Sequence, residues 1–131
     1  MPKKKRILII DDDKFVLNGF KRALELEGYR VDTAETGKAA IAKSKADFYD
    51  LALIDIRLPD VEGTQLVSEL HEGEPKMVKI IVTGYASQDN AVEALNQGAD
   101  GYIIKPVLNM NEFLKTIKKH LKKYEETKKL Q

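Results

Sequence analysis

The sequence predicts an α/β protein in which one parallel β-sheet carries helices on both faces. Two observations lead to this class. Short, uninterrupted apolar runs recur along the chain, as is typical of strands buried on both faces of a parallel sheet. Segments with apolar residues at helical spacing alternate with these runs, which gives five strand–helix units in a row. Right-handed crossovers between parallel strands then place helices on both faces of a single sheet, so the fold is doubly wound.

The elements follow from these patterns in chain order. Strands are expected at residues 7–10, 29–34, 49–54, 78–82 and 101–104. Helices are expected at residues 14–27 and 37–45, around residues 66–70, and from 112 to about 126, and residues 91–97 are expected to lie in the fourth helix. Gly28 closes the first helix, because glycine accepts the left-handed conformation found after a helix end. In the last helix an apolar stripe of Phe113, Ile117, Leu121 and Tyr124 is expected to dock on the sheet.

Length and composition restrict the class further. A chain of 131 residues with 43% hydrophobic and 33% charged residues fits one globular domain. It has no cysteine, which excludes disulfides and thiolate metal sites. No apolar segment reaches the roughly 18 residues of a membrane span, so no membrane association is expected. The basic start runs into a short apolar segment that ends at three aspartates, unlike a signal peptide. A cytoplasmic location is therefore expected.

The net charge of +1 hides an uneven distribution. Residues 7–114 carry 11 basic and 19 acidic side chains, whereas both ends of the chain are basic. An acidic body attracts divalent cations. The basic C-terminal helix comes with no recognition motif and no aromatic platform, so direct nucleic-acid binding is not expected. His71 and His120 are expected to be solvated residues on helix surfaces.

Four of the apolar runs end at a polar side chain that could serve in a phosphate-binding site. The first run ends at Asp11, Asp12 and Asp13, and the later ones end at Asp55, Thr83 and Lys105. In a parallel sheet all strand carboxyl ends emerge at one edge, and ligands bind outside that edge. Carboxylates, a hydroxyl and an ammonium group are therefore expected to meet in one crevice.

These groups suit phosphoryl transfer to a carboxylate. Asp55 would be the nucleophile, since carboxylates can attack phosphorus. Two anions approach each other only with a cation between them, and Mg²⁺ prefers oxygen ligands such as Asp11, Asp12 and a backbone carbonyl near Arg57. Lys105 and the Thr83 hydroxyl would hold further phosphoryl oxygens, because the transition-state charge is spread over three of them.

Each of these residues also has a purely structural explanation. The aspartate run can cap the following helix, and Asp13 is expected to do so. An aspartate at a strand end commonly forms a turn, and threonine is ordinary in strands. The functional interpretation is favoured because all of them arrive at one sheet edge.

The chain resembles the receiver domain of two-component response regulators, of the chemotaxis-regulator type, over residues 5–123. The motifs that carry the resemblance are Asp11-Asp12 after the first strand, Ile54-Asp55 with Arg57-Leu58-Pro59-Asp60 and Gly63, Val82-Thr83-Gly84-Tyr85, Gly98-Ala99-Asp100-Gly101-Tyr102, and Lys105-Pro106. The resemblance implies a single flavodoxin-like (βα)5 domain with strand order 2-1-3-4-5. Residues 1–123 would form the receiver domain, and residues 124–131 a polar helical tail or the start of a linker.

The resemblance also implies roles for single residues. Asp55 would accept a phosphoryl group from a histidine kinase or phosphotransfer protein. Mg²⁺, or Mn²⁺ in its place, would be bound by Asp12, Asp55 and the Arg57 carbonyl, with Asp11 acting through water. Thr83 and Lys105 would contact the phosphoryl group. Gly63 would be structural, and Lys105–Pro106 would be a cis peptide, an isomer found in about 5–6% of such bonds.

The expected output is a conformational switch. Phosphorylation would draw the Thr83 hydroxyl inward, and the Tyr102 ring would turn into the vacated space. This would change the face made by the fourth helix, the fifth strand and the last helix. A downstream protein or a fused output domain would read that face, and a homodimer through it is a further option. The alternative is a Tyr102 that only covers the sheet edge, with its hydroxyl in water.

Two other functions compete with the switch. An aspartate-nucleophile phosphatase usually has a second aspartate two residues after the nucleophile, where this chain has Arg57. An interaction module that does not depend on phosphorylation usually lacks one of the acidic or switch residues, and this chain has all of them. The protein is therefore not expected to be a conventional enzyme, although it would catalyse its own phosphorylation and dephosphorylation.

Overall fold

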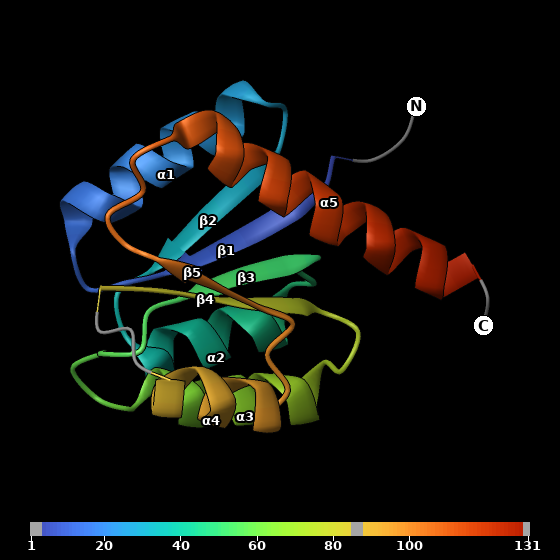
Figure 1. Ribbon diagram of the computed structural model, residues 1–131. Coiled ribbons are helices and arrows are strands. Elements are labelled where there is room, and N and C mark those ends of the chain that lie inside the picture. The colour runs from blue at the N-terminus through green and yellow to red at the C-terminus, as the bar shows by residue number, and fades with distance from the viewer. Residues whose placement is uncertain (1–3, 85–87, 130–131) are drawn as a thin grey trace.

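A computed structural model describes residues 4–84 and 88–129. The strands are β1 (Arg6–Ile10), β2 (Arg30–Ala34), β3 (Leu51–Ile54), β4 (Val78–Thr83) and β5 (Gly101–Ile104). The helices are α1 (Lys14–Leu26), α2 (Gly37–Ala46), α3 (Gly63–Gly73), α4 (Gln88–Asn96) and α5 (Met110–Lys129). Strands and helices alternate along the chain, as the sequence predicts (Figure 1).

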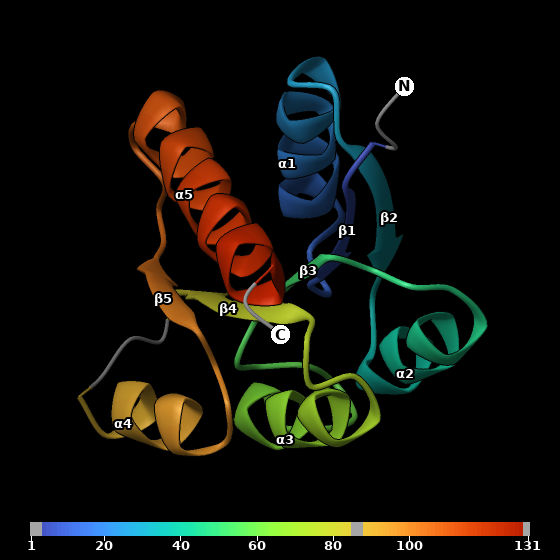
Figure 2. The same ribbon diagram turned by 90° about the vertical axis from the view of Figure 1, so that its right-hand side faces the viewer.

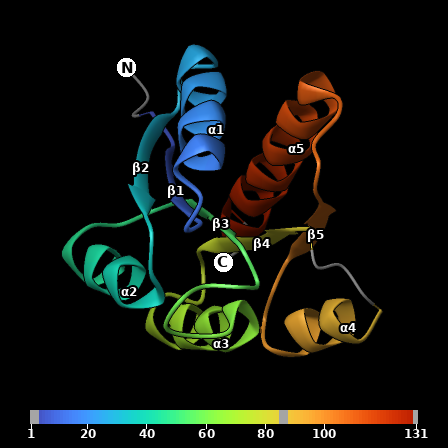
Figure 3. The ribbon, with the colours of Figure 1, turned by 90° about the vertical axis from the view of Figure 1, so that its left-hand side faces the viewer.

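The five strands form one parallel sheet in the order β2-β1-β3-β4-β5. The predicted fold class and strand order are confirmed. Helices α1 and α5 cover one face of the sheet, and α2, α3 and α4 cover the other (Figure 2). The view from the opposite side shows the same two layers (Figure 3). Because all strands are parallel, their carboxyl ends lie at a single edge.

Two hydrophobic cores hold the helices on the sheet. Under α1 and α5, the strand residues pack against Leu17, Phe20, Leu24, Phe113, Ile117 and Leu121. The stacked rings of Phe20 and Phe113, with centroids 4.7 Å apart, join α1 to α5. Under α2, α3 and α4, the alternate strand residues pack against Ala40, Leu66, Val67, Leu70 and Ala94. Alternation along each strand therefore supplies both cores from the same short apolar runs.

Local signals fix several helix ends as predicted. Asp13 is the N-cap of α1, and its side chain accepts hydrogen bonds from the backbone N–H groups of Phe15 and Val16. Gly28 follows α1 with a φ of +95°, and Gly98 follows α4 with a φ of +109°. In the described residues, no helix is both long enough and apolar enough to cross a membrane.

Most element boundaries lie within one residue of the sequence prediction, and the larger differences are at β3 and α5. β3 begins at Leu51, two residues later than expected, because the Asp50 carboxylate accepts a hydrogen bond from the Arg6 backbone N–H at 2.8 Å. α4 (Gln88–Asn96) contains nearly all of residues 91–97, which the sequence places in the fourth helix. α5 begins at Met110, where the Asn109 side chain accepts a hydrogen bond from the Glu112 N–H, and it continues to Lys129.

The expectation that His120 is a solvated surface residue is wrong. His120 is half-buried, and a Cβ at Gly101 would lie 3.0 Å from its Nε2 atom. Burial lowers the pKa of His120 below its ordinary value. His120 falls three residues after Ile117 and four before Tyr124, so it lies beside the apolar stripe that docks α5 on the sheet. His71 is exposed, as expected.

Lys79 is the unexpected member of the core. It is the second residue of β4, and only 1% of its surface is exposed. It alternates with Val78 and Ile80, so its side chain points toward the α2, α3 and α4 layer. Its ammonium group donates a hydrogen bond to the Met77 carbonyl. Burial lowers the pKa of Lys79, although the charges of Asp100 and Glu74 oppose this effect.

We predict that Lys79→Met raises the free energy of unfolding by about 1–3 kcal/mol at pH 7, since an apolar side chain of similar volume avoids burying a charge. The lowered pKa means that the unfolded state binds this proton more tightly, so wild-type stability rises with pH. The penalty is full below the folded-state pKa and vanishes as the pH passes the ordinary value of 10.5. The advantage of Lys79→Met should therefore shrink at alkaline pH.

Chemical denaturation at several pH values would measure this difference. The exposed neighbour Lys76 supplies the control, because Lys76→Met should change stability by less than about 0.5 kcal/mol. Destabilisation by Lys79→Met at pH 7 would show instead that the bond to Met77 outweighs the burial of the charge.

Candidate phosphoacceptor and metal site

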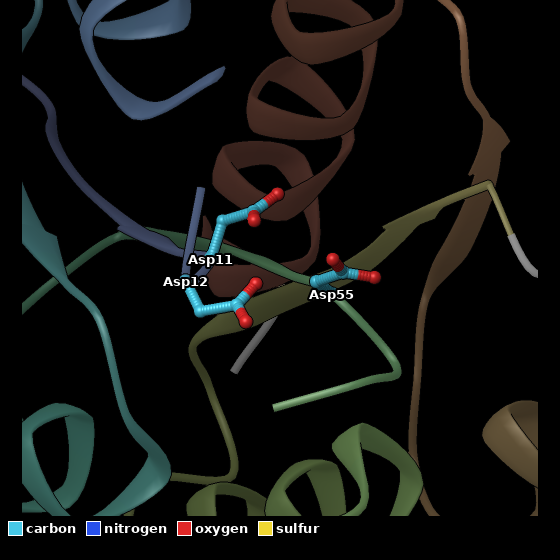
Figure 4. A group of neighbouring side chains, drawn as sticks. All are labelled: Asp11, Asp12 and Asp55. Carbon is cyan, nitrogen blue, oxygen red and sulfur yellow. The ribbon is translucent and has the colours of Figure 1, made fainter. Parts of the chain in front are cut away.

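Three aspartates gather at the carboxyl edge of the sheet. Asp11 directly follows β1 and Asp55 directly follows β3, and these two strands are neighbours in the sheet. The Asp55 N–H donates to the Ile10 carbonyl at 3.0 Å, which holds the two strand ends together. One carboxylate oxygen from each of Asp11, Asp12 and Asp55 lies within 4.8 Å of the others (Figure 4). The carboxylate cluster expected from the sequence is therefore present.

Strand alternation explains why Lys105 joins this cluster. Asp11, Asp55 and Lys105 each lie two residues beyond a strand residue that packs in the core under α1 and α5. These core residues are Ile9, Leu53 and Ile103. The three polar side chains therefore continue the same face of the sheet past its edge.

The Lys105 ammonium group bridges two of the carboxylates. Its Nζ atom lies 2.5 Å from Asp11 Oδ2 and 3.3 Å from Asp55 Oδ2. Burial alone would lower the pKa of Lys105, but the hydrogen bond and charge of Asp11 and the charge of Asp55 outweigh it and raise the pKa. Burial raises the pKa of Asp11, against the hydrogen bond from Lys105. Three carboxylates facing one ammonium leave an excess of negative charge, which a divalent cation would neutralise.

The site is deep but open on one side. Asp11 is 3% exposed and Asp55 6% exposed, whereas Asp12 is exposed at the rim. Asp55 Oδ1 is buried and accepts no hydrogen bond from the residues that the structure describes. A buried acceptor without a donor is unfavourable. This oxygen and the neighbouring carboxylates therefore fit the all-oxygen coordination that Mg²⁺ prefers.

The loop after β3 is held tightly against the site. Arg57 pairs with Glu62 through an isolated antiparallel bridge, and the Gly63 N–H donates to the Ile56 carbonyl at 2.6 Å. A Cβ at Gly63 would lie 2.2 Å from the Asp55 carbonyl oxygen. Only glycine allows this approach, so Gly63 keeps the loop folded over the residues next to Asp55.

Thr83 and Tyr102 lie on the other face of the sheet. Thr83 ends β4 and is fully buried. Tyr102 in β5 is paired with Ile81 in β4. Ile81 belongs to the core under α2, α3 and α4, and Tyr102 packs against that core. Thr83 comes two residues after Ile81, so it points to the same side as the Tyr102 ring. The Tyr102 hydroxyl oxygen is buried, which contradicts the alternative that this hydroxyl lies in water.

β5 ends beside Thr83. The Lys105 N–H donates a hydrogen bond to the Thr83 carbonyl at 2.9 Å. Backbone pairing with β4 therefore fixes the position of the Lys105 backbone, from which its side chain extends. The Lys105–Pro106 peptide is cis. Tyr85, which the sequence places two residues past Thr83, lies outside the described residues.

Asp60 is a residue whose contact the sequence analysis missed. Its carboxylate accepts hydrogen bonds from the Gly37 and Lys38 backbone N–H groups at the start of α2. The sequence offers Asp60 only as part of a loop motif. No local signal links positions 23 residues apart, because the contact exists only once the loop is folded.

A parallel doubly wound sheet with a carboxylate cluster and a lysine at its carboxyl edge defines the class of protein. The model of the response regulator receiver domain family matches residues 7–118 of the chain. The chain therefore belongs to the family of response regulator receiver domains, which act in two-component systems.

Individual relatives agree with this assignment. The alginate biosynthesis transcriptional regulatory protein AlgB from Pseudomonas aeruginosa is 36% identical over 104 residues, which cover 79% of this chain and 23% of that protein. The chain therefore matches less than a quarter of that relative. A CheY-like receiver domain protein from Methanospirillum hungatei JF-1 has a solved structure with a TM-score of 0.92 and 50% identity, covering 95% of this chain and 99% of that one.

A third relative was solved in a modified state. It is a response regulator protein from Burkholderia pseudomallei with a phosphorylated aspartic acid, a calcium ion and citrate. Its structure gives a TM-score of 0.82 at 29% identity, covering 97% of this chain and 74% of that chain.

We predict that Gly63→Ala destabilises the protein by about 3 kcal/mol, since the added Cβ meets backbone atoms that cannot yield. It would lie 2.6 Å from the Ile56 Cα atom as well as against the Asp55 carbonyl. Gly19→Ala is the matched control, because a Cβ there meets nothing within 4 Å inside α1, and it should stabilise by up to about 1 kcal/mol. Equal thermal unfolding midpoints for the two variants would show that the β3–α3 loop is not packed closely around Gly63.

Proposed function

We propose that the protein is a phosphorylation-dependent signalling switch in which Asp55 accepts a phosphoryl group from a histidine kinase or phosphotransfer protein. The observation that carries this proposal is the buried Asp55 carboxylate, which has one oxygen paired with Lys105 and the other without a donor among the described residues. A carboxylate oxygen without a donor is available to attack phosphorus.

The residues have distinct roles in the transfer. An Asp55 oxygen forms the new bond to phosphorus while the bond from phosphorus to the donor histidine nitrogen breaks, and the imidazole leaves with a proton. Lys105 already lies between Asp11 and Asp55, so its ammonium group is placed to pair with a phosphoryl oxygen. The Thr83 hydroxyl at the end of β4 would hold another oxygen.

A divalent cation completes the charge balance. Asp11, Asp12, Asp55 and the backbone carbonyl of Arg57 are proposed to hold Mg²⁺ or Mn²⁺, with Asp11 contributing through water. When bound, the cation would neutralise the repulsion between the carboxylates and the incoming phosphoryl group. The Burkholderia pseudomallei relative, which was solved with a phosphorylated aspartic acid and a calcium ion, supports this role.

The output is proposed to pass through the α4-β5-α5 face. Thr83 and Tyr102 lie on the same side of the sheet, so movement of Thr83 toward a phosphoryl group would change the packing of Tyr102. The ring is already half-buried, so its movement would start from a partly inward position. Large apolar side chains exposed on this face suit a partner: Val92, Leu95, Ile104 and Leu108.

The partner that reads this face is proposed to be a downstream protein or a fused output domain, or a second copy of the chain in a homodimer. The match to only part of a transcriptional regulatory protein supports the fused domain. The receiver domain would cover residues 1–123. Residues from 124 onward would be a polar tail or the start of a linker, since α5 continues unbroken to Lys129. The cytoplasm is the proposed location.

The phosphatase alternative is disfavoured by the site. Arg57 stands two residues after Asp55, where such enzymes use an acid–base carboxylate. The proposed activity is instead a single phosphorylation, followed by autodephosphorylation. The interaction module that needs no phosphorylation is disfavoured because the carboxylates and Lys105 are assembled.

Exposure to acetyl phosphate with Mg²⁺, followed by mass spectrometry of the intact protein, tests this proposal. We expect the wild type to gain one phosphoryl group, and we expect Asp55→Asn or a chelator to abolish the gain. Asp13→Asn is the matched control, because asparagine caps α1 as well as aspartate does. Labelling that persists in Asp55→Asn, or steady turnover of a generic phosphomonoester, would reject the proposed mechanism.

A further inference from the structure

The start of α2 is bound by the loop between β3 and α3. Asp60 Oδ1 accepts a hydrogen bond from the Gly37 N–H at 2.8 Å, and Asp60 Oδ2 accepts one from the Lys38 N–H at 2.9 Å. The first N–H groups of a helix have no partner within it, and a carboxylate there also meets the positive end of the helix dipole. These two hydrogen bonds lower the pKa of Asp60, so it carries its charge at neutral pH.

A close packing contact accompanies these hydrogen bonds. A Cβ at Gly37 would lie only 2.3 Å from Val61 Cγ1 and 3.4 Å from Asp60 Oδ1. The backbone of α2 therefore lies directly against the tip of the loop. Val61 in turn packs against the core under α2, α3 and α4, so the contact is continuous with the body of the domain.

The base of the same loop is fixed at the phosphoacceptor. Gly63 lies against the Asp55 carbonyl, and Arg57 is bridged to Glu62. Asp60 lies three residues after Arg57 in the sequence, within the loop segment that the bridge from Arg57 to Glu62 closes. The loop segment that carries Arg57 is therefore held at its base by Gly63 and at its tip by Asp60.

We propose that Asp60 is a positioning residue for the cation site. Its paired hydrogen bonds to α2 hold the β3–α3 loop in the conformation that keeps the Arg57 carbonyl near the carboxylate cluster. This inference rests on the proposed function, because it assumes that the Arg57 carbonyl binds the cation. It adds that α2, which supplies no ligand, contributes to cation affinity through its first two N–H groups.

Mn²⁺ titration of the intact chain, with free Mn²⁺ followed by electron paramagnetic resonance, tests the proposal. Asp60→Ala should raise the Kd for Mn²⁺ about tenfold, the lower end of what residues that orient a metal ligand contribute. Asp60→Asn keeps one acceptor oxygen and should fall between Asp60→Ala and the wild type. It also serves as the informative variant if Asp60→Ala does not fold. The titrations are made at high salt, which screens the loss of the Asp60 charge itself.

Thr36→Ala is the matched control. The Thr36 side chain accepts a hydrogen bond from the Ala39 N–H at 3.0 Å, so its loss also weakens the start of α2 but leaves the loop untouched. A purely structural role for Asp60 would make both variants lose stability and keep the same Kd. The proposal requires the Kd to change in Asp60→Ala and to stay within about twofold of wild type in Thr36→Ala.

The outcomes separate this inference from the proposed function. If the wild type binds Mn²⁺ and Asp60→Ala binds it equally well, the positioning role is overturned while the cation site stands. If the wild type does not bind Mn²⁺, the cation site fails and the positioning role fails with it. A parallel rise in Kd for Asp60→Ala and Thr36→Ala would assign the effect to α2 stability and would also overturn the proposal.

Discussion

The structure depends on the compensation of negative charge at the carboxyl edge of the sheet. Asp11 and Asp55 are both almost fully buried, and their carboxylates lie close together. Such an arrangement would be unfavourable without a positive partner, because burial and like charge both oppose ionisation. The Lys105 ammonium group supplies that partner from a third strand end. It is one charge short of balance with the two buried carboxylates, and the exposed Asp12 adds to the deficit. The same excess of negative charge that Lys105 only partly balances is what a divalent cation would neutralise in the proposed function.

The sheet makes this arrangement possible because it fixes both where the strand ends lie and to which face their side chains point. Parallel strands bring the ends of β1, β3 and β5 to one edge, and the alternation of side chains points Asp11, Asp55 and Lys105 to one face. The same alternation sends Thr83 and Tyr102 to the opposite face. Asp55 and Tyr102 therefore lie on opposite faces of the sheet, and the pairing of β4 with β5 links the carboxyl edge at Thr83 to Tyr102. Figure 2 shows how α4 and α5 flank β5 from the two layers.

Much of this could be predicted from the sequence, because the signals are local. Apolar runs gave the strands, and polar residues at their ends gave Asp11, Asp12, Asp55, Thr83 and Lys105 as one group. The predictions that were wrong concern contacts between distant segments. His120 is expected from the sequence to be a solvated residue on a helix surface, yet it packs against Gly101 in β5. The bonds of Asp60 to α2 and the burial of Lys79 likewise depend on tertiary packing, which no short motif reports.

Lys105 and a bound divalent cation would compensate the same excess of negative charge, so we infer that the two compete for it in the unphosphorylated protein. This competition can be measured by titrating Mg²⁺ into Lys105→Met and into the wild type, with binding followed by nuclear magnetic resonance. Removing a unit charge a few ångströms from the ligands should tighten Mg²⁺ binding about tenfold. Lys14→Met, which removes an exposed lysine that faces Glu35, should change the affinity by less than about twofold. Unchanged or weaker Mg²⁺ binding by a folded Lys105→Met would show that Lys105 does not compete with the cation.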